Sequence, residues 1–382
     1  MSVRKPIYLD YNATTPVDRE VVEAMMPYFL ENFGNASSAH SHGWDAEEAV
    51  DDAREKVAQL VNANSNEIIF TSGATESINL AIQGVINDSV LPNKHMVAVS
   101  TEHKAVLDTC TYLKSKDVEI SYLNVDQNGL IDLGELQKSI KENTLLISVM
   151  YANNETGVIQ SIKEIGKIAR DNTAIFFSDA TQAVGKIPVD VVQDNIDLMA
   201  FSAHKLYGPK GVAALYVKRT NPKIEIQPLV FGGGHEKGLR SGTLNVPGIV
   251  GFGKVCELSL LHLKSEQLRI STLRDEMELK LLEIEGVQIN CKDVRRLPNT
   301  TSVSFQDIEA NMLIESLGNE ISISTGSACT TNNPEPSQVL KAMGLNPEQV
   351  HGSIRISLGK STTNKELEYF LQRIKELVTV LV

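Results

Sequence analysis

Between about residue 65 and residue 217, short apolar runs alternate with amphipathic stretches. The runs have the length of buried strands, and the stretches are long enough to form helices that cross from one strand to the next. This alternation predicts a doubly wound α/β domain with a mainly parallel sheet. The expected strands are Glu67–Phe70, Met96–Ser100, Val118–Asn124, Leu145–Met150, Ala174–Ser178, Leu198–Phe201 and Val212–Val217. The expected helices include Ala105–Lys116, Leu133–Lys141 and Ile162–Arg170.

The regions on either side of this core have a different pattern. Upstream, apolar residues recur at helical spacing and predict an amphipathic helix over Asp45–Val61. Past residue 247 a smaller α+β domain is expected, with a long charged helix, two strands and a last helix at Val255–Glu285, Thr301–Phe305, Glu320–Ser324 and Thr363–Val380. We therefore expect a large domain over residues 15–258 and a small domain built from residues 1–14 and 259–382.

Composition narrows the class of protein. A chain of 382 residues, 42% of them hydrophobic, can bury a full core. It contains no run of about 18 consecutive apolar residues and begins without a signal-peptide pattern, which predicts a cytoplasmic protein without a membrane anchor. The formal net charge of −12 argues against direct nucleic-acid binding and favours a small-molecule substrate or a protein partner.

The four cysteines are far apart, without a Cys-x-x-Cys pair or a dense disulfide framework. We expect three of them to be buried as small apolar side chains, so a reactive cysteine must be identified from its surroundings. The most loop-like part of the chain, Thr325–Gln338, contains Cys329.

Lys205 directly follows an apolar strand and precedes a Gly-Pro-Lys-Gly turn. A lysine at a strand end can form an imine with an aldehyde cofactor, and the neighbouring Ser202 and His204 could bind a phosphate. The alternative is a solvated surface lysine before a turn, which is the more common situation for a lysine considered alone.

Asp179 ends another apolar strand, at the edge where open α/β sheets bind ligands. Its carboxylate could pair with the protonated nitrogen of a cofactor ring, while Gln182 could donate a hydrogen bond to a ring oxygen. Alternatively, Asp179 caps a following helix.

Two more segments follow strands. Thr71–Ser77 opens a helix, and its backbone N–H groups with the hydroxyls of Ser72 and Thr75 can bind a phosphate, or can form an ordinary helix start. His103 can stack on a planar cofactor and carry protons near neutral pH, or can be structural. Because the carboxyl ends of consecutive parallel strands meet in one crevice, we expect these groups to lie together.

Taken together, these motifs resemble those of the fold-type I pyridoxal-phosphate enzymes of the class V aminotransferase superfamily, specifically the NifS/IscS-type cysteine desulfurases. The similarity covers nearly the whole chain, with few departures, such as Ala36 where proline is usual and Lys360 where arginine is common. It runs through Tyr8–Pro16, Phe33–Ser38, Thr71–Ser77, Glu102–Lys104, Asn153–Gly157, Asp179–Gln182, Ser202–Lys205, Gly232–Glu236, Arg240–Thr243, Thr325–Cys329 and Arg355–Gly359.

The resemblance implies a role for each matching residue. Lys205 would hold pyridoxal 5′-phosphate as a Schiff base, Asp179 would pair with the pyridine nitrogen, His103 would stack on the ring and Gln182 would contact its phenolate. The substrate carboxylate would be bound by Arg355 and Asn154. The phosphate would be bound by Ala74, Thr75, Ser202, His204 and, from the other subunit of a homodimer, Thr243.

The segment Ser327–Thr330 resembles the nucleophile loop of the first desulfurase group, so Cys329 would take sulfur from L-cysteine as a persulfide and leave L-alanine. The resemblance also implies a sulfur-acceptor protein, such as an iron–sulfur scaffold or a tRNA-thiolation protein. A selenocysteine lyase or another class V enzyme is the nearest alternative, and a non-catalytic scaffold is an alternative from another class.

Overall fold

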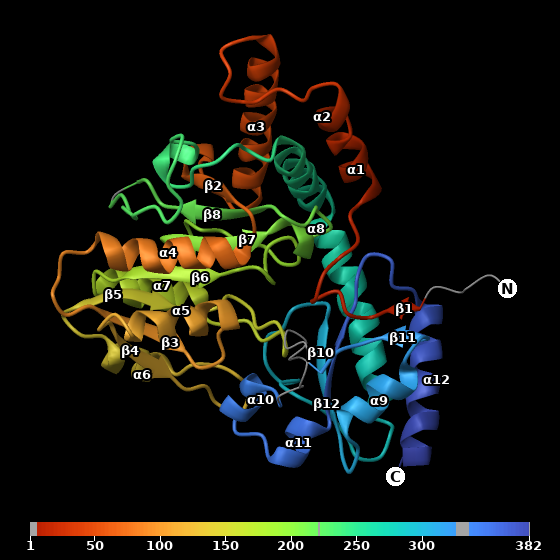
Figure 1. Ribbon diagram of the computed structural model, residues 1–382. Coiled ribbons are helices and arrows are strands. Elements are labelled where there is room, and N and C mark those ends of the chain that lie inside the picture. The colour runs from red at the N-terminus through yellow and green to blue at the C-terminus, as the bar shows by residue number, and fades with distance from the viewer. Residues whose placement is uncertain (1–5, 221, 326–335, 382) are drawn as a thin grey trace.

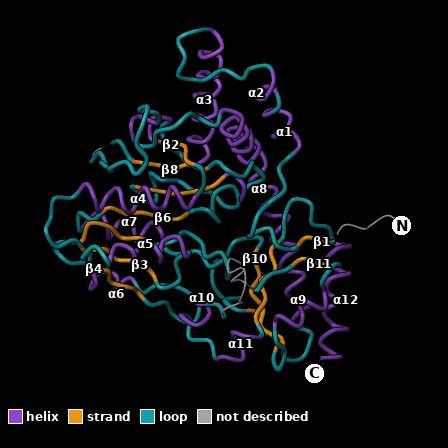
Figure 2. Tube along the Cα trace, viewed as in Figure 1, coloured by secondary structure: helices purple, strands orange, loops and turns teal. Residues whose placement is uncertain are grey.

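The computed structural model describes residues 6–220, 222–325 and 336–381. Figure 1 shows a layer of strands and helices built from the first two thirds of the chain and a smaller layer built mainly from the last third. In Figure 2 the strands form two groups, one among helices α4 to α7 and the other beside α9 and α12.

The large sheet has seven strands in the order β2-β8-β7-β6-β5-β3-β4. Strands β4, β3, β5, β6 and β7 are parallel, whereas β8 runs antiparallel to both of its neighbours. The expectation of a mainly parallel sheet is therefore confirmed. The strands are β2 (Ile68–Thr71), β3 (His95–Val99), β4 (Glu119–Leu123), β5 (Thr144–Ser148), β6 (Ile175–Asp179), β7 (Leu198–Ser202) and β8 (Ala213–Val217).

Apart from the edge strand β4, the strands of this sheet are buried on both faces, which explains why they are largely continuous apolar runs. Alternate residues belong to different cores: Phe177 packs with Ile78 of α4, whereas Phe176 packs on the opposite face with Ile165 of α7. Figure 1 shows α4 lying along the sheet. The helices of this layer are α1 (Arg19–Met25), α2 (Pro27–Leu30), α3 (Ser41–Leu60), α4 (Ala74–Asp88), α5 (Lys104–Lys114), α6 (Leu133–Ser139) and α7 (Ile162–Asp171).

The smaller layer contains an antiparallel sheet with strand order β12-β10-β9 and a parallel pair, β1-β11. A separate core lies among the three-stranded sheet, α9 and α12. The strands are β1 (Ile7–Tyr8), β9 (Val287–Ile289), β10 (Thr300–Phe305), β11 (Ile321–Ser322) and β12 (Ser353–Ser357). The helices are α9 (Ala310–Leu317), α10 (Gln338–Ala342), α11 (Pro347–His351) and α12 (Asn364–Leu381).

Helix α8 (Val246–Leu281) joins the two layers. Phe252, in its first half, packs in the core of the large sheet, and Met277, in its second half, packs in the core of the small layer. The helix is long and apolar enough to span a membrane by length and composition, but 56% of its most apolar 18-residue window is buried inside the fold. Helix α8 is therefore a core helix. The expected domain boundaries, between residues 14 and 15 and between residues 258 and 259, stay a prediction.

Candidate active site

A cavity of about 400 Å³ opens at the carboxyl ends of β3, β5, β6 and β7. Residues from the N-terminal segment, the start of α4 and β12 complete its wall. Apart from Thr243 and Cys329, every site residue predicted from the sequence lines this cavity: Ala74, Thr75, His103, Asn154, Asp179, Gln182, Ser202, His204, Lys205 and Arg355. Residues that follow strands far apart in the sequence thus meet at one cavity, as expected for the carboxyl ends of parallel strands.

Lys205 lies in a short 3-10 turn, Ala203–Lys205, directly after β7. Its Nζ donates hydrogen bonds to the backbone carbonyl oxygens of Asn12 and Ala13, at 2.6 and 2.7 Å. The amine therefore lies inside the cavity wall and is held by the N-terminal segment. This arrangement excludes the alternative of a solvated surface lysine.

Asp179 is the last residue of β6 and is 5% exposed. Its Oδ1 accepts a hydrogen bond from the backbone N–H of Thr181 at 2.9 Å. The residues that follow form turns rather than an α-helix, so Asp179 is not a helix cap. Its carboxylate is fixed at the cavity wall, a position that can stabilise a positive charge within the cavity.

His103 caps α5, and its Nδ1 accepts a hydrogen bond from the backbone N–H of Ala105 at 3.1 Å. His103 therefore has a structural role as a helix cap, and this role leaves its other ring nitrogen available for a functional one. Because Nδ1 acts as an acceptor, the proton of the neutral ring is on Nε2. The cap thus fixes both the ring position and its tautomer beside the cavity.

One end of the cavity can bind an anion. Helix α4 begins at Ala74 after Gly73, and the structure shows no side-chain cap for its first N–H groups. The hydroxyl of Ser72 donates to Glu76, so this predicted phosphate donor is already engaged, whereas Thr75 lines the cavity.

His204 contributes to the same cavity, with its Nδ1 3.0 Å from Thr14 Oγ1. Burial, followed by the positive charges of Lys205, Lys210 and Lys186, lowers the pKa of His204 to about 4. The ring is therefore neutral at pH 7 in the protein alone. Ser202, two residues earlier, is buried and lines the cavity as well.

Arg355 lies in the middle of β12 and is 4% exposed. Its Nη2 pairs with Asp10 Oδ1 at 2.6 Å, and its Nη1 donates to the carbonyl oxygen of Asn154 at 3.1 Å. Among the described residues, its buried Nε has no hydrogen-bond partner. A guanidinium with a donor still available is suited to a small carboxylate.

Cys110, Cys256 and Cys291 are buried, as expected. Burial raises the pKa of Cys110 and of Cys291 to about 12, and raises that of Cys256 well above its usual range. These thiols are therefore poor nucleophiles at neutral pH. Cys329 lies outside the described residues, and Thr243 is exposed and outside the cavity wall.

Sequence reasoning missed two contributors to the site, Asn12 and Lys186. Asn12 lines the cavity and accepts from Lys205, and Lys186 donates to Gln182 Oε1 at 2.5 Å. Asn12 lies within the N-terminal motif, which was a usable signal. Lys186 follows an apolar turn segment, and its sequence context alone does not reveal that it contacts Gln182.

The model of the aminotransferase class-V family matches residues 7–370. The chain belongs to the class-V aminotransferase family. Its cofactor is pyridoxal 5′-phosphate, and the cavity fits this group because it combines a lysine amine, a buried carboxylate and an open helix start in one wall.

Individual relatives agree with this assignment. This class-V enzyme is 49% identical to the cysteine desulfurase IscS of Neisseria meningitidis serogroup C, over 99% of this chain and 93% of the relative. It superposes on a NifS-like protein with a TM-score of 0.92 at 39% identity, covering 98% of this chain and all of the other. A structure of SspA in complex with cysteine has a TM-score of 0.82 at 38% identity and covers 93% and 99% of the two chains.

Proposed function

We propose that this protein is a cysteine desulfurase that converts L-cysteine to L-alanine and retains the sulfur as a persulfide on Cys329. The observation that carries the proposal is the convergence of Lys205, Asp179 and Arg355 on one cavity. The N. meningitidis relative is named a cysteine desulfurase, and SspA was solved with cysteine. Both support L-cysteine as the substrate.

The residues are assigned to the cofactor by their chemistry. Lys205 would bind it covalently, Asp179 would face its ring nitrogen and His103 would lie against its ring. Gln182 would donate to its ring oxygen. Its phosphate would be bound by the start of α4 at Ala74 and Thr75, and by Ser202, His204 and the partner's copy of residue 243.

When bound, pyridoxal 5′-phosphate accepts the electron pair left on the substrate when its Cα loses a proton. The chain's own residues then move protons and hold the substrate. Lys205 is placed to take the Cα proton once its amine is released. His103 can exchange a proton at Nε2, because its Nδ1 is held by Ala105. Arg355 and Asn154 orient the substrate through its carboxylate.

Sulfur transfer is the step that separates this activity from transamination. The Cys329 thiolate attacks the substrate sulfur, an S–S bond forms and the substrate Cβ–S bond breaks. Cβ then takes up a proton. Cysteine and the enzyme thiol thus give alanine and an enzyme persulfide without an external oxidant. The burial of Cys110, Cys256 and Cys291 supports Cys329 as the acceptor.

A homodimer is part of the proposal. The arm formed by α2 and the start of α3 exposes large apolar side chains, with Leu30 73% and Phe33 67% exposed. A surface hollow brings Trp44 of this arm together with Leu244, the neighbour of Thr243. Exposed apolar side chains on this arm, with Trp44 near Leu244, are expected where a second subunit covers them.

The remaining assignments concern the setting of the reaction. We propose a cytoplasmic enzyme that delivers its persulfide sulfur to an acceptor protein for iron–sulfur cluster assembly or tRNA thiolation. A net charge of −12 does not favour direct contact with nucleic acid. Selenocysteine remains an alternative substrate because the same cavity would accept it.

The decisive experiment incubates the enzyme, loaded with pyridoxal 5′-phosphate, with L-cysteine and a reductant. Alanine and sulfide should form in equal amounts. Cys329→Ser should bind the cofactor but form no protein persulfide, whereas Cys291→Ala, which removes a buried thiol, should keep persulfide formation. Alanine without sulfide, or a persulfide on another cysteine in Cys329→Ser, would contradict the proposal.

A further inference from the structure

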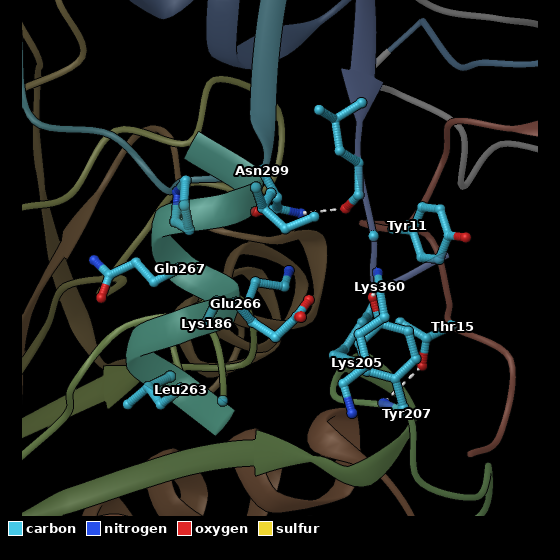
Figure 3. A pocket seen from close by; sticks show the side chains of 15 residues that line it. Tyr11, Thr15, Lys186, Lys205, Tyr207, Leu263, Glu266, Gln267, Asn299 and Lys360 are labelled. Atoms are coloured by element: carbon cyan, nitrogen blue, oxygen red, sulfur yellow. Dashed lines mark hydrogen bonds between the residues drawn. The ribbon is translucent and has the colours of Figure 1, made fainter. Parts of the chain in front are cut away.

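We propose that Lys186 is a positioning residue that fixes the side-chain amides of Gln182 and Asn12, and through them the surroundings of Lys205 and of the cofactor ring oxygen. This inference rests on the proposed cofactor contacts of Gln182 and Lys205. Figure 3 shows Lys186 on the wall of a second pocket, which is also lined by Lys205, Tyr207, Glu266 and Lys360.

The first observation is the contact between Lys186 and Gln182. Lys186 Nζ donates a hydrogen bond to Gln182 Oε1 at 2.5 Å, and a lysine ammonium group can only donate, so it would repel the amide N–H₂ group at that position. Gln182 is therefore held with its oxygen toward Lys186. Its Nε2 is on the other side, where it donates to the Asn12 carbonyl oxygen at 3.0 Å.

The second observation is that Lys186 also orients Asn12. Lys186 Nζ donates to Asn12 Oδ1 at 3.1 Å, and Asn299 Nδ2 donates to the same oxygen at 3.0 Å. The side-chain nitrogen of Asn12 then faces Thr300 Oγ1, at 2.9 Å. The backbone carbonyl of Asn12 is thereby fixed, and this carbonyl accepts from both Gln182 and Lys205.

Lys186 is placed to act as a positioning residue rather than by direct contact with a ligand. Lys205 lines both the large cavity and the second pocket, whereas Lys186 lines the second pocket but not the large cavity. Lys186 therefore reaches the reaction cavity through Gln182 and Asn12. Its effect on a ligand in that cavity must be indirect.

The charge of Lys186 also affects the site. In the part of the chain that the structure describes, no carboxylate lies within ion-pair distance of Lys186, and both of its acceptors are neutral amides. Burial, followed by the nearby charges of Lys205 and Arg355, holds the pKa of Lys186 well below its usual range. Lys186 in turn adds to the positive potential at Lys205 whenever it is protonated.

The orientation of Gln182 and the positive charge of protonated Lys186 both favour loss of the proton from the imine nitrogen of the bound cofactor. A Gln182 N–H group held toward the ring oxygen stabilises negative charge on that oxygen, and a nearby positive charge disfavours a further proton on the imine nitrogen. Replacing Lys186 should therefore raise the pH midpoint at which the absorption of the bound cofactor changes.

The experiment measures this midpoint, and the affinity for pyridoxal 5′-phosphate, in Lys186→Met, which has a similar length and no donor. We expect the midpoint to rise by about one pH unit and the affinity to fall about tenfold. Lys223→Met, which removes an exposed lysine on another surface, serves as the control and should change neither value.

A double-mutant cycle separates positioning from a general effect on folding. If Lys186 acts through Gln182, then Lys186→Met should add little to the loss of affinity that Gln182→Leu already produces. Lys186→Arg, which keeps donors and charge, should restore the midpoint. If Lys186→Met does not fold, as judged by circular dichroism, Lys186→Gln replaces it, and its midpoint should also rise because the Nζ donor shared by Gln182 and Asn12 is lost.

An unchanged midpoint in folded Lys186→Met or Lys186→Gln, or fully additive losses of affinity in the cycle, would overturn the inference. Failure of the proposed function would look different. In that case the wild-type protein itself would bind no pyridoxal 5′-phosphate, or would bind it and release no sulfide from cysteine.

Discussion

Asp10 and Arg355 form an ion pair of 2.6 Å, which joins the N-terminal segment to β12 at the wall of the cavity. The Arg355 side chain is 4% exposed and that of Asp10 is 16% exposed, so the pair is largely removed from water. The substrate-binding arginine of the proposed mechanism is thus held in place before any substrate is bound, because Asp10 and the Asn154 carbonyl take its two Nη groups.

Asp10→Ala should destabilise the protein strongly, because it leaves a buried guanidinium without its carboxylate. Removal of one partner of a buried pair costs about 3–5 kcal/mol, whereas exposed pairs contribute about 1 kcal/mol or less. The matched control is Glu23→Ala, which breaks the exposed pair of Arg19 and Glu23 at 2.8 Å. Urea unfolding of both variants measures the difference, and equal transition midpoints would contradict the prediction.

The strand-end residues could be predicted from the sequence because their positions depend on local patterns. A run such as Leu198–Phe201 is apolar throughout, and the polar residues directly after it must then lie at the sheet edge. Lys205, Asp179 and His103 follow such runs. Parallel pairing then brings these residues to one edge without any knowledge of individual contacts.

Other parts of the site depend on contacts between distant segments. Strand β12 reads Ser-Ile-Arg-Ile-Ser, and its alternation of polar and apolar residues does not indicate a strand that is buried at every position. The role of Arg355 is therefore implied only by the family resemblance. The pairing of Arg355 with Asp10 and the contact of Lys186 with Asn12 join residues far apart in the chain. Helix α8 also begins earlier than predicted, at Val246, where Asn245 caps it.

His204 should couple anion binding to proton uptake. Its pKa is about 4 in the protein alone, and an anion bound beside it favours the protonated ring, so the pKa rises on binding. The affinity of the cofactor-free protein for sulfate, which does not titrate in this range, should therefore increase as the pH falls from 8 toward 5. Calorimetry in buffers of different ionisation enthalpy should detect proton uptake by the wild type and less uptake by His204→Asn. Equal uptake by both proteins would exclude His204 from the anion site.

His95 predicts a separate effect of pH on stability. It is fully buried at the start of β3, with Nδ1 2.7 Å from Thr144 Oγ1 and Nε2 2.9 Å from Ser121 Oγ. Burial, followed by the charge of Lys141, lowers the pKa of His95 below 6.5, although Glu119 opposes this. At His95 the unfolded chain therefore binds more protons than the folded protein as the pH falls below about 6.5.

The stability contributed by neutral His95 is complete above pH 6.5 and decreases as the pH falls below it. The urea midpoint of the wild type should decrease from pH 7.5 to pH 5.0 by more than that of His95→Gln, whose amide does not titrate. Both proteins share all other titrating groups, so the comparison isolates His95. The same decrease in both would show that His95 does not contribute to the pH dependence.

Thr243 is exposed and lies outside the cavity wall of its own chain. If Thr243 completes the phosphate site of the partner subunit, then a site needs Lys205 from one chain and Thr243 from the other. Lys205→Ala and Thr243→Asp should each have very low activity, the first because it lacks the amine and the second because a carboxylate repels the phosphate.

Mixing the two variants under conditions that exchange subunits should restore activity. A mixed dimer has one site with both substitutions and one site with neither, and about half of the dimers are mixed, so about a quarter of the wild-type activity should return. If Thr243 acted within its own chain, both sites of the mixed dimer would carry one substitution and no activity would return. Mixing Lys205→Ala with Asp179→Ala is the control, because both residues line the cavity of a single chain and should not complement each other.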